Sequence, residues 1–159
     1  MILVTLGTQD KTFIRLLEKI DDLIEKGLIK DQVVVQSGYT KYHSSNMEIF
    51  DLIPQDEFNS LMEKADIIIT HGGVGSIISA LEKGKKVIAI PRLAKYGEHI
   101  NDHQTQIVSK FNSLGYLIGL QEVDELEPAL KKIKKFKPRP FIHDNSKMLN
   151  LVGKLIDEC

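Results

Sequence analysis

The sequence predicts an α/β domain, an open parallel sheet of about six strands with helices on both faces. Short runs of β-branched and aliphatic residues alternate along the chain with segments that repeat apolar residues at helical spacing. The runs are apolar throughout rather than at every second position, as expected for strands covered on both faces of a parallel sheet. They span residues 2–6, 32–36, 48–52, 66–70, 86–90 and 116–120.

Helices are predicted in most of the connections between these runs. The first connection carries an apolar stripe from Phe13 to Ile24, and Gly27 follows it as a stop signal. Between the fourth and fifth runs, a short helix is expected to begin at the capping-type residue Ser76 and to end at Gly84. Three further stripes lie at residues 58–65, 107–114 and 126–133.

Two segments depart from this alternation. Residues 37–47 are polar without a helical stripe, so a loop is predicted there. Residues 134–140 form a basic, proline-broken linker, after which a last apolar stripe predicts a C-terminal helix. We therefore expect a main domain over residues 1–134, followed by a linker and helix over 135–159 that either dock on a partner or pack on their own domain. The stripe consists of Met148, Leu149, Val152, Leu155 and Ile156.

Composition argues against several classes of protein. Lysine and arginine number 21 against 22 aspartates and glutamates, so the net charge of -1 lacks the basic footprint of a nucleic-acid binder. The single Cys159 can form no internal disulfide, which fits a cytoplasmic location. No apolar run approaches the ~20 residues needed to span a bilayer, and Met1 leads directly into strand-like sequence. We expect neither a membrane anchor nor a secretion signal. A basic tract from Lys131 to Arg139 is either a solvated face or a contact for anionic lipid headgroups.

The loop after the fourth run, His71-Gly72-Gly73-Val74-Gly75-Ser76, is the most informative motif. Its glycines let a ligand approach the main chain, and the amides at the start of the next helix favour an anion such as a diphosphate. The plain alternatives are a tight turn and a core histidine. The loop lacks the third glycine of the dinucleotide fingerprint, and the chain has no glycine-lysine-serine phosphate loop.

A second glycine-bearing loop, Gly7-Thr8-Gln9-Asp10, follows the first run. Because ligands on parallel sheets bind beyond the carboxyl ends of the strands, both loops are expected to line one cleft. The alternative for this loop is a simple turn in which Thr8 or Asp10 caps the next helix.

A third cluster of polar side chains follows the fifth run and could hydrogen-bond the hydroxyl groups of a sugar. Two histidines and an aspartate in it are spaced like metal ligands, but no further clear ligand is near, so no metal is expected. The alternative is a helix start capped by Asn101 or Asp102. The cluster comprises Glu98, His99, Asp102, His103 and Gln104.

Together, these motifs resemble the carboxyl-terminal, donor-binding domain of family 28 glycosyltransferases, which have the GT-B fold. The resemblance covers residues 1 to about 120, and it depends on the combination rather than on any one glycine loop. It implies that the sheet is the Rossmann-like half of a GT-B fold and that residues 1–134 bind a nucleotide-sugar donor. The motifs that carry it lie at residues 3–9, 36–38, 66–76, 81–84, 87–91 and 102–104.

The layout is most similar to the stand-alone catalytic subunits of this family, found in bacterial capsule and exopolysaccharide synthesis and in eukaryotic lipid-linked oligosaccharide synthesis. The resemblance implies inverting transfer from a UDP-sugar, with UDP-galactose or UDP-N-acetylglucosamine favoured, to a lipid-diphosphate-linked saccharide. A membrane-associated partner subunit would supply the acceptor-binding half and hold the chain at the inner face of the membrane. No cofactor, metal or nucleic acid is implied. The alternatives are a non-catalytic accessory subunit that binds the nucleotide sugar and a small nucleotide-binding regulatory module.

The resemblance also assigns roles to individual residues. His71 is the catalytic candidate, either as general base or as a group that serves the leaving phosphate. Ser79 stands where many relatives have a ribose-binding glutamate, and Glu82, one helical turn further, is the expected substitute. The diphosphate contacts are Gly7, Thr8, Gly72, Gly73, Gly75 and Ser76, and the uracil and ribose contacts are Phe50, Leu52, Ile53, Ser79 and Glu82. The resemblance implies sugar contacts at Asp102, His103 and Gln104, to which the cluster after the fifth run adds Glu98 and His99.

Overall fold

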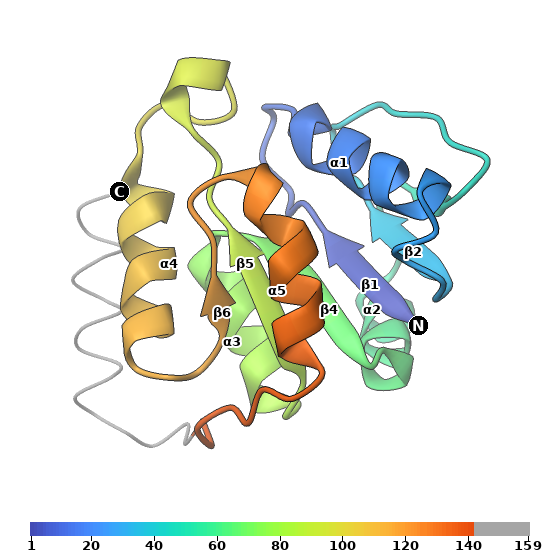
Figure 1. Ribbon diagram of the computed structural model, residues 1–159. Coiled ribbons are helices and arrows are strands. Elements are labelled where there is room, and N and C mark those ends of the chain that lie inside the picture. Colours follow the sequence, from blue (N-terminus) through green and yellow to red (C-terminus); the bar gives the residue numbers. More distant parts are fainter. Residues whose placement is uncertain (142–159) are drawn as a thin grey trace.

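The computed structural model describes residues 1–141, which contain one sheet of six parallel strands (Figure 1). The strand order is β3-β2-β1-β4-β5-β6. The predicted fold class is confirmed, and each of the six predicted runs overlaps a strand. The strands are β1 (Ile2–Thr5), β2 (Val33–Gln36), β3 (Glu48–Phe50), β4 (Ile67–His71), β5 (Lys86–Ile90) and β6 (Ile118–Gly119).

Helices cover both faces of the sheet (Figure 1). One layer consists of α1 (Ile14–Glu25) and α5 (Leu126–Ile133), and the other of α2 (Gln55–Lys64), α3 (Val74–Glu82) and α4 (His103–Ser113). Two short 3-10 turns, η1 (Ala94–Tyr96) and η2 (Val123–Glu125), precede α4 and α5. Within residues 1–141, no helix has the length and apolar character needed to cross a membrane.

The two helical layers are joined to the sheet by side chains that alternate along each strand. In β1, Ile2 and Val4 belong to the core under α1 and α5, whereas Leu3 belongs to the core on the other face. Leu3 pairs in register with Val34 of β2 and Ile68 of β4, which lie in the same core as Leu3. Because both faces are covered, the strands have the continuous apolar sequence that predicted them.

The two central strands, β1 and β4, are parallel neighbours, and the order in which strands are added to the sheet reverses between them. From β1 the chain continues outward through β2 to β3, and from β4 it continues outward on the other side through β5 to β6. The loops that leave β1 and β4 lead to helices on opposite faces, α1 and α3. Such a reversal opens a crevice at the carboxyl edge of the sheet, which is the usual ligand position in this class of fold.

Two predicted boundaries are wrong in detail. Helix α3 begins at Val74 rather than Ser76, because Gly73 has the extended backbone of an N-cap residue and the chain turns helical directly after it. Ser76 therefore lies inside the first turn and caps nothing. The sixth strand is shorter than predicted, because only Ile118 and Gly119 pair with β5.

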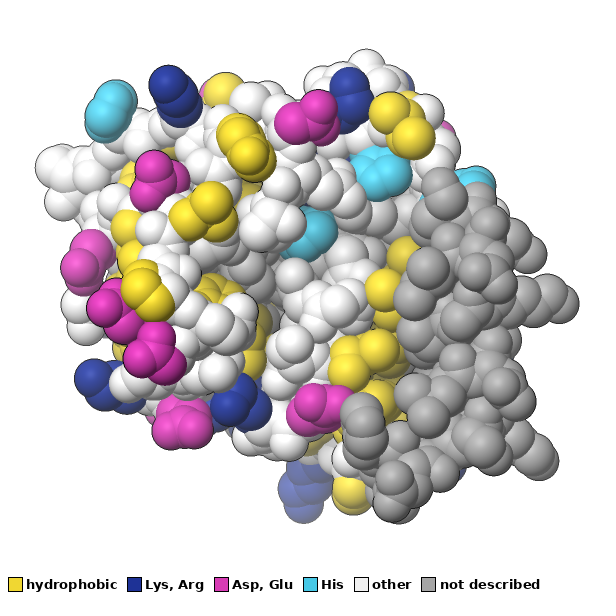
Figure 2. All heavy atoms as spheres, turned by 180° about the vertical axis from the view of Figure 1, so that it is seen from behind, with side chains coloured by type: hydrophobic (Ala, Val, Ile, Leu, Met, Phe, Trp, Pro, Cys, Tyr) yellow, Lys and Arg dark blue, Asp and Glu magenta, His cyan; other side chains and the backbone are white. Residues whose placement is uncertain are grey.

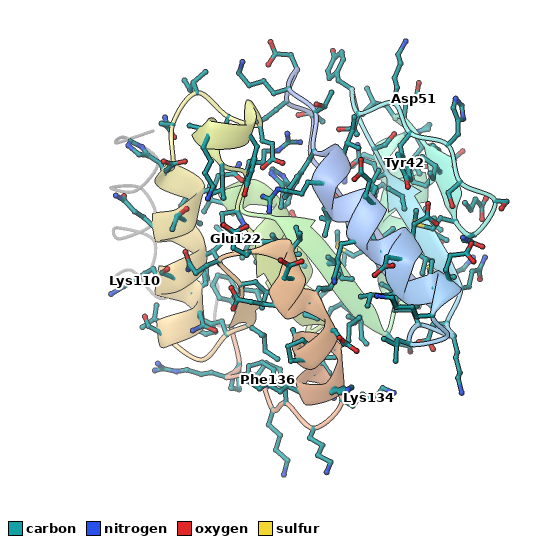
Figure 3. All side chains as sticks on the ribbon, turned by 45° about the horizontal axis from the view of Figure 1, so that its top comes forward. Tyr42, Asp51, Lys110, Glu122, Lys134 and Phe136 are labelled. Carbon is teal, nitrogen blue, oxygen red and sulfur yellow. The ribbon has the colours of Figure 1, made fainter. Side chains whose placement is uncertain are left out.

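The chain after α5 stays attached to the domain as far as Phe141. Phe136 packs against the core next to α5, at the opposite end of the molecule from Asp51 (Figure 3). The main-chain N–H of Arg139 donates to the carbonyl of Gly115 at 2.9 Å, and the Phe141 ring packs edge-on against Tyr116 with 5.5 Å between centroids. The predicted C-terminal helix, with its stripe over 148–156, lies outside the described residues.

Candidate functional site at the carboxyl edge of the sheet

A cavity of about 460 Å³ lies at the carboxyl ends of β1, β2 and β4. Its walls come from the loops after β1 and β4 and from the chain that leads from β3 into α2. Figure 2 shows the side of the molecule covered by α2 and α3, which is hollowed and carries histidine side chains. Nine of the residues predicted from the sequence line this cavity: Gly7, Thr8, Leu52, Ile53, His71, Gly73, Gly75, Ser76 and Ser79.

The start of α3 presents main-chain amides to the cavity. The first amide with a partner inside the helix is that of Ile77, which donates to the carbonyl of Gly73 at 3.1 Å. The amides of Val74, Gly75 and Ser76 precede it and therefore have no acceptor within the helix. Together with the positive end of the helix dipole, they form a site suited to an anion.

His71, the last residue of β4, is held between two glycines. A Cβ atom at Gly7 would overlap Nε2 of the imidazole, and one at Gly73 would overlap Cε1. Nε2 of His71 lies 3.3 Å from Oγ of Ser76, and Nδ1 lies 3.3 Å from Nε2 of Gln104. The glycines are thus required for the position of the histidine, in addition to any contact that they make with a ligand.

The electrostatic surroundings keep the His71 ring neutral. The side chain is 3% exposed. Burial lowers the pKa of His71 to about 3, and the positive charge of Arg92 contributes in the same direction. At neutral pH the ring therefore carries a single proton.

Arg92 is a buried cation behind this site that the sequence analysis did not single out. It is 1% exposed, and its guanidinium donates to the carbonyls of Leu6, Lys11 and Glu98. Burial lowers the pKa of Arg92 to about 10, so the group is still charged at neutral pH. It adds a fixed positive charge near His71 and favours an anionic ligand in the cavity.

Gln36, at the end of β2, is a second residue that sequence reasoning missed. Its side-chain amide donates to the carbonyls of Gly7 and Asp51 and accepts from the hydroxyl of Thr5. The side chain joins the ends of three adjacent segments and sets the shape of the cavity floor. Two signals in the sequence pointed to it: a polar residue at the end of an apolar run, and its place in the motif at residues 36–38 that contributes to the family resemblance.

The wall formed by α2 is largely apolar. Leu52, Ile53, Phe58 and Met62 line the cavity there, and Ser79 of α3 lies on the same cavity. Two residues predicted for this region do not line it. Phe50 packs against the core under α2, α3 and α4, and Glu82 ends α3 one turn beyond Ser79.

Gly72 lies behind the cavity rather than on its surface. Its amide donates to Oε1 of Gln104 at 3.1 Å, so it is not directed at a ligand. A Cβ atom at this position would stand 2.8 Å from Cβ of Gln104, so the glycine allows α4 to pack close to β4. The predicted diphosphate contact at Gly72 is therefore not supported by this arrangement.

The predicted sugar-binding cluster does not line the cavity either, and three of its side chains are hydrogen-bonded to other groups of the protein. The carboxylate of Glu98 is 5% exposed and accepts two hydrogen bonds from Arg15. Asp102 accepts from the main-chain N–H of Ala94 at 2.8 Å. Gln104 is 2% exposed and bonded on both ends of its amide. These side chains hold the loop between β5 and α4 in place.

The other two members of this cluster lie near the start of α4. The main-chain N–H of His103, the first residue of α4, donates to Oδ1 of Asn101 at 3.0 Å, whereas the N-cap residue Asp102 makes no side-chain capping bond. Nδ1 of His99 accepts from the N–H of Asn101 at 3.3 Å. Nδ1 of His103 is buried and has no hydrogen-bond partner among the described residues. Across residues 1–141, no three histidine, cysteine or acidic side chains are arranged to hold a metal ion.

Comparison with known proteins supports one family. Residues 1–157 match the sequence profile described as the glycosyltransferase family 28 C-terminal domain. The UDP-N-acetylglucosamine transferase subunit ALG13 of Candida albicans is 28% identical over 113 residues, which cover 71% of this chain and 37% of that protein. The solution structure of an ALG13 superimposes with a TM-score of 0.61 at 21% identity and covers 94% of this chain and 93% of the other.

A larger glycosyltransferase shares the same fold over part of its length. The crystal structure of the kitacinnamycin glycosyltransferase superimposes with a TM-score of 0.63 at 23% identity, covering 83% of this chain and 34% of that one. This chain therefore corresponds to about one third of that enzyme. The chain also spans only part of the length of its curated relatives, 37% of the Candida albicans protein and 52% of the Candida glabrata ALG13.

Proposed function

Because the chain belongs to the family of glycosyltransferase family 28 C-terminal domains, we propose that it is the donor-binding, catalytic subunit of a two-component, UDP-dependent glycosyltransferase. The observation that carries this proposal is the cavity at the carboxyl ends of β1 and β4, which is lined by the start of α3, where main-chain amides have no partner within the helix, and by His71. Such a site is complementary to a diphosphate.

In this proposal the diphosphate lies between the β1–α1 loop and the start of α3. The amides of Val74, Gly75 and Ser76 bind its oxygens, and the charge of Arg92 adds a favourable field. During transfer, the bond from the anomeric carbon to the β-phosphate oxygen breaks and its electrons remain on UDP. Hydrogen-bond donors that are already oriented toward that oxygen stabilise the developing negative charge. Such stabilisation is often the largest contribution of an enzyme to the rate of a reaction of this kind. No metal or cofactor is proposed, because these groups can fill that role.

The nucleoside is placed against the apolar wall. Leu52, Ile53 and Phe58 offer a surface for a flat uracil ring, and Ser79 is positioned on the cavity for a ribose hydroxyl. The transferred sugar would extend toward the start of α4, which begins at His103 and which His99 precedes. UDP-N-acetylglucosamine is the donor that we favour, since several relatives are named as its transferase subunits. UDP-galactose is the second candidate.

The acceptor and its binding half are assigned to a partner. The relatives are named as subunits, and one third of the kitacinnamycin enzyme corresponds to this chain. We propose a membrane-associated partner that binds a lipid-diphosphate-linked saccharide and supplies the general base, with this chain at the inner face of the membrane. The acceptor hydroxyl then attacks the anomeric carbon with inversion. A place in capsule or exopolysaccharide synthesis is proposed from the sequence resemblance alone, and a non-catalytic accessory subunit is the alternative.

The test is calorimetric titration of the full chain with UDP, ADP, UDP-N-acetylglucosamine and UDP-galactose. A matched pair of variants, Gly75→Asp and Gly75→Asn, locates the site. A Cβ atom at Gly75 meets nothing within 4 Å, so both variants should fold. The two side chains have the same shape and differ by one negative charge.

We expect selective binding of UDP and its sugars over ADP. Gly75→Asp should bind UDP about tenfold more weakly than Gly75→Asn, because the added carboxylate repels the diphosphate. Equal affinity for UDP and ADP, or equal affinity of the two variants, would contradict the proposed donor site. Transfer by the complex with its partner then separates a catalytic subunit from an accessory one. At saturating donor both variants are occupied, so only a catalytic subunit should transfer more slowly with Gly75→Asp than with Gly75→Asn, because the carboxylate opposes the charge that develops on UDP.

A further inference from the structure

Gln104 is the one residue of the predicted sugar-binding cluster that contacts His71. It lies in the first turn of α4, is 2% exposed and is not among the residues that line the cavity. Its Oε1 accepts two main-chain hydrogen bonds, from Gly72 at 3.1 Å and from Arg92 at 3.0 Å. Its Nε2 lies 3.3 Å from Nδ1 of His71.

The two main-chain donors fix which way the Gln104 amide points. An amide nitrogen carries two donors and no acceptor, so it cannot occupy the position that faces two N–H groups. The oxygen must lie there, and the NH₂ group must face His71. A neutral imidazole has one donor nitrogen and one acceptor nitrogen, so Nδ1 is the acceptor and the proton lies on Nε2.

We propose that Gln104 is a positioning residue that holds His71 as the tautomer protonated on Nε2, so that the ring presents a hydrogen-bond donor, not a base, to the cavity. The inference rests on the proposed function only for the identity of the ligand, a diphosphate oxygen. It decides between the two roles that the sequence left open for His71, because a ring whose Nε2 carries the proton cannot accept one from a hydroxyl at that atom.

The groups around the ring all favour this state. Ser76 places its hydroxyl 3.3 Å from Nε2, where it can accept the proton in the absence of a ligand. The positive charge of Arg92 disfavours a second proton on the ring, and His99 contributes in the same direction. Neither Gly7 nor Gly73 has room for a Cβ atom beside the ring, so both glycines restrict where the imidazole can lie.

The experiment is long-range ¹H–¹⁵N correlation spectroscopy of the full chain, with His71 assigned by comparison with His71→Asn. Free wild-type protein should show the Nε2-protonated tautomer at pH 7. Observation of the Nδ1-protonated tautomer, or of rapid exchange between the two, would overturn the proposal. This measurement needs no ligand and no partner.

The variant Gln104→Glu tests whether Gln104 sets the tautomer. One carboxylate oxygen can still accept from Gly72 and Arg92, while the other replaces the NH₂ donor with an acceptor. We expect Nδ1 of His71 to become protonated in this variant, whereas the ring of His43, far along the sequence in the β2–β3 loop, should be unchanged. Retention of the wild-type tautomer in folded Gln104→Glu would refute the assignment to Gln104. If the variant does not fold, the tautomer of the wild-type ring still confirms or refutes the proposal.

Addition of UDP separates this inference from the proposed function. If UDP binds, the Nε2–H resonance of His71 should shift and exchange more slowly with water, because a phosphate oxygen replaces Ser76 as acceptor. Binding by calorimetry with no change at Nε2–H would overturn the donor role. If UDP does not bind at all, the proposed function fails, while the tautomer in the free protein still confirms or refutes the positioning role of Gln104.

Discussion

Gly7 and His71 are in direct contact across the two central strands, and the contact leaves no room for a side chain on Gly7. A Cβ atom there would overlap the imidazole, and the φ angle of Gly7 is +75°, a conformation that other residues rarely adopt. The turn after β1 and the histidine at the end of β4 therefore determine each other's position. The glycine motif is as much a support for His71 as a surface for a ligand.

Gly7→Ala should for this reason lower the free energy of unfolding by about 3 kcal/mol, through strain and overlap with the ring. Gly75→Ala is the matched control, because its Cβ meets nothing within 4 Å and alanine is the better helix former. Urea unfolding followed by circular dichroism measures both. Equal stabilities for the two variants would contradict the packing described here.

The stability of the domain should fall as the pH is lowered from 7 to 5. The pKa of His71 is lowered from 6.5 to about 3 by burial, so in this range the unfolded chain binds a proton that the folded chain does not. The folded state is then fully favoured above pH 6.5 and loses stability as the pH falls toward 3, by up to about 1.4 kcal/mol per pH unit. His99, whose pKa is also lowered by burial, contributes with the same sign.

Urea unfolding at several pH values measures this dependence, and His71→Asn should flatten it by roughly one proton. Because that variant can lose stability for other reasons, a direct titration of the wild-type ring by NMR is the second measurement. His71 should show no titration between pH 5 and 8. A midpoint near 6.5 would refute the buried, neutral state.

The carboxylate of Asp21 organises the loop between β2 and β3. It accepts hydrogen bonds from Tyr42 at 2.6 Å, Ser44 at 2.6 Å and Asn46 at 3.0 Å. Tyr42 lies beside α1 (Figure 3).

The hydrogen bond to Asp21 raises the pKa of the Tyr42 hydroxyl to about 12, and burial contributes in the same direction. Asp21→Asn should move this pKa back toward 10, as read from the tyrosinate absorbance. The variant Tyr42→Phe identifies which part of the absorbance change at high pH belongs to Tyr42. An unchanged titration in Asp21→Asn would contradict the hydrogen bond between Tyr42 and Asp21.

Arg15 joins two carboxylates of different burial, which allows a paired test. It donates to Glu98, whose side chain is 5% exposed, and to Glu122, which is 40% exposed and lies near the start of α5 (Figure 3). Glu98→Gln should cost about 3 kcal/mol, because it leaves a partly buried guanidinium without its main counter-charge. Glu122→Gln should cost less than about 1 kcal/mol, since exposed ion pairs contribute little. Thermal unfolding measures the stability of both variants. A larger loss of stability for Glu122→Gln than for Glu98→Gln would contradict the greater contribution expected from the buried ion pair.

The fold was predictable because its signals are local. The apolar runs that became β1, β2, β4 and β5 and the stripe that became α1 each lie within a dozen residues of sequence, and parallel topology then places the loops after β1 and β4 at one edge. Six of the nine predicted residues that line the cavity follow from that placement, and Leu52, Ile53 and Ser79 came from the family resemblance. The start of α3 was misplaced because Gly73, and not Ser76, has the backbone of the N-cap.

The roles of individual polar side chains were not predictable in the same way. Glu98, Asp102 and Gln104 have the residue types of a sugar site, yet the first two bind the protein's own donors and the third faces His71. Arg92 carried no signal in the sequence and lies buried against the carbonyl of Leu6, 86 positions away.

The sequence by itself determined the strands, the helices and the edge at which ligand-binding loops meet, since hydrophobic periodicity and glycine positions act over a few neighbouring residues. Only the tertiary structure decided which polar groups face the cavity and which are bonded to the protein. A hydrogen bond depends on two groups being brought within about 3 Å of each other, and for Gln104 and His71, 33 residues apart, that distance is set by the packing of α4 against the sheet.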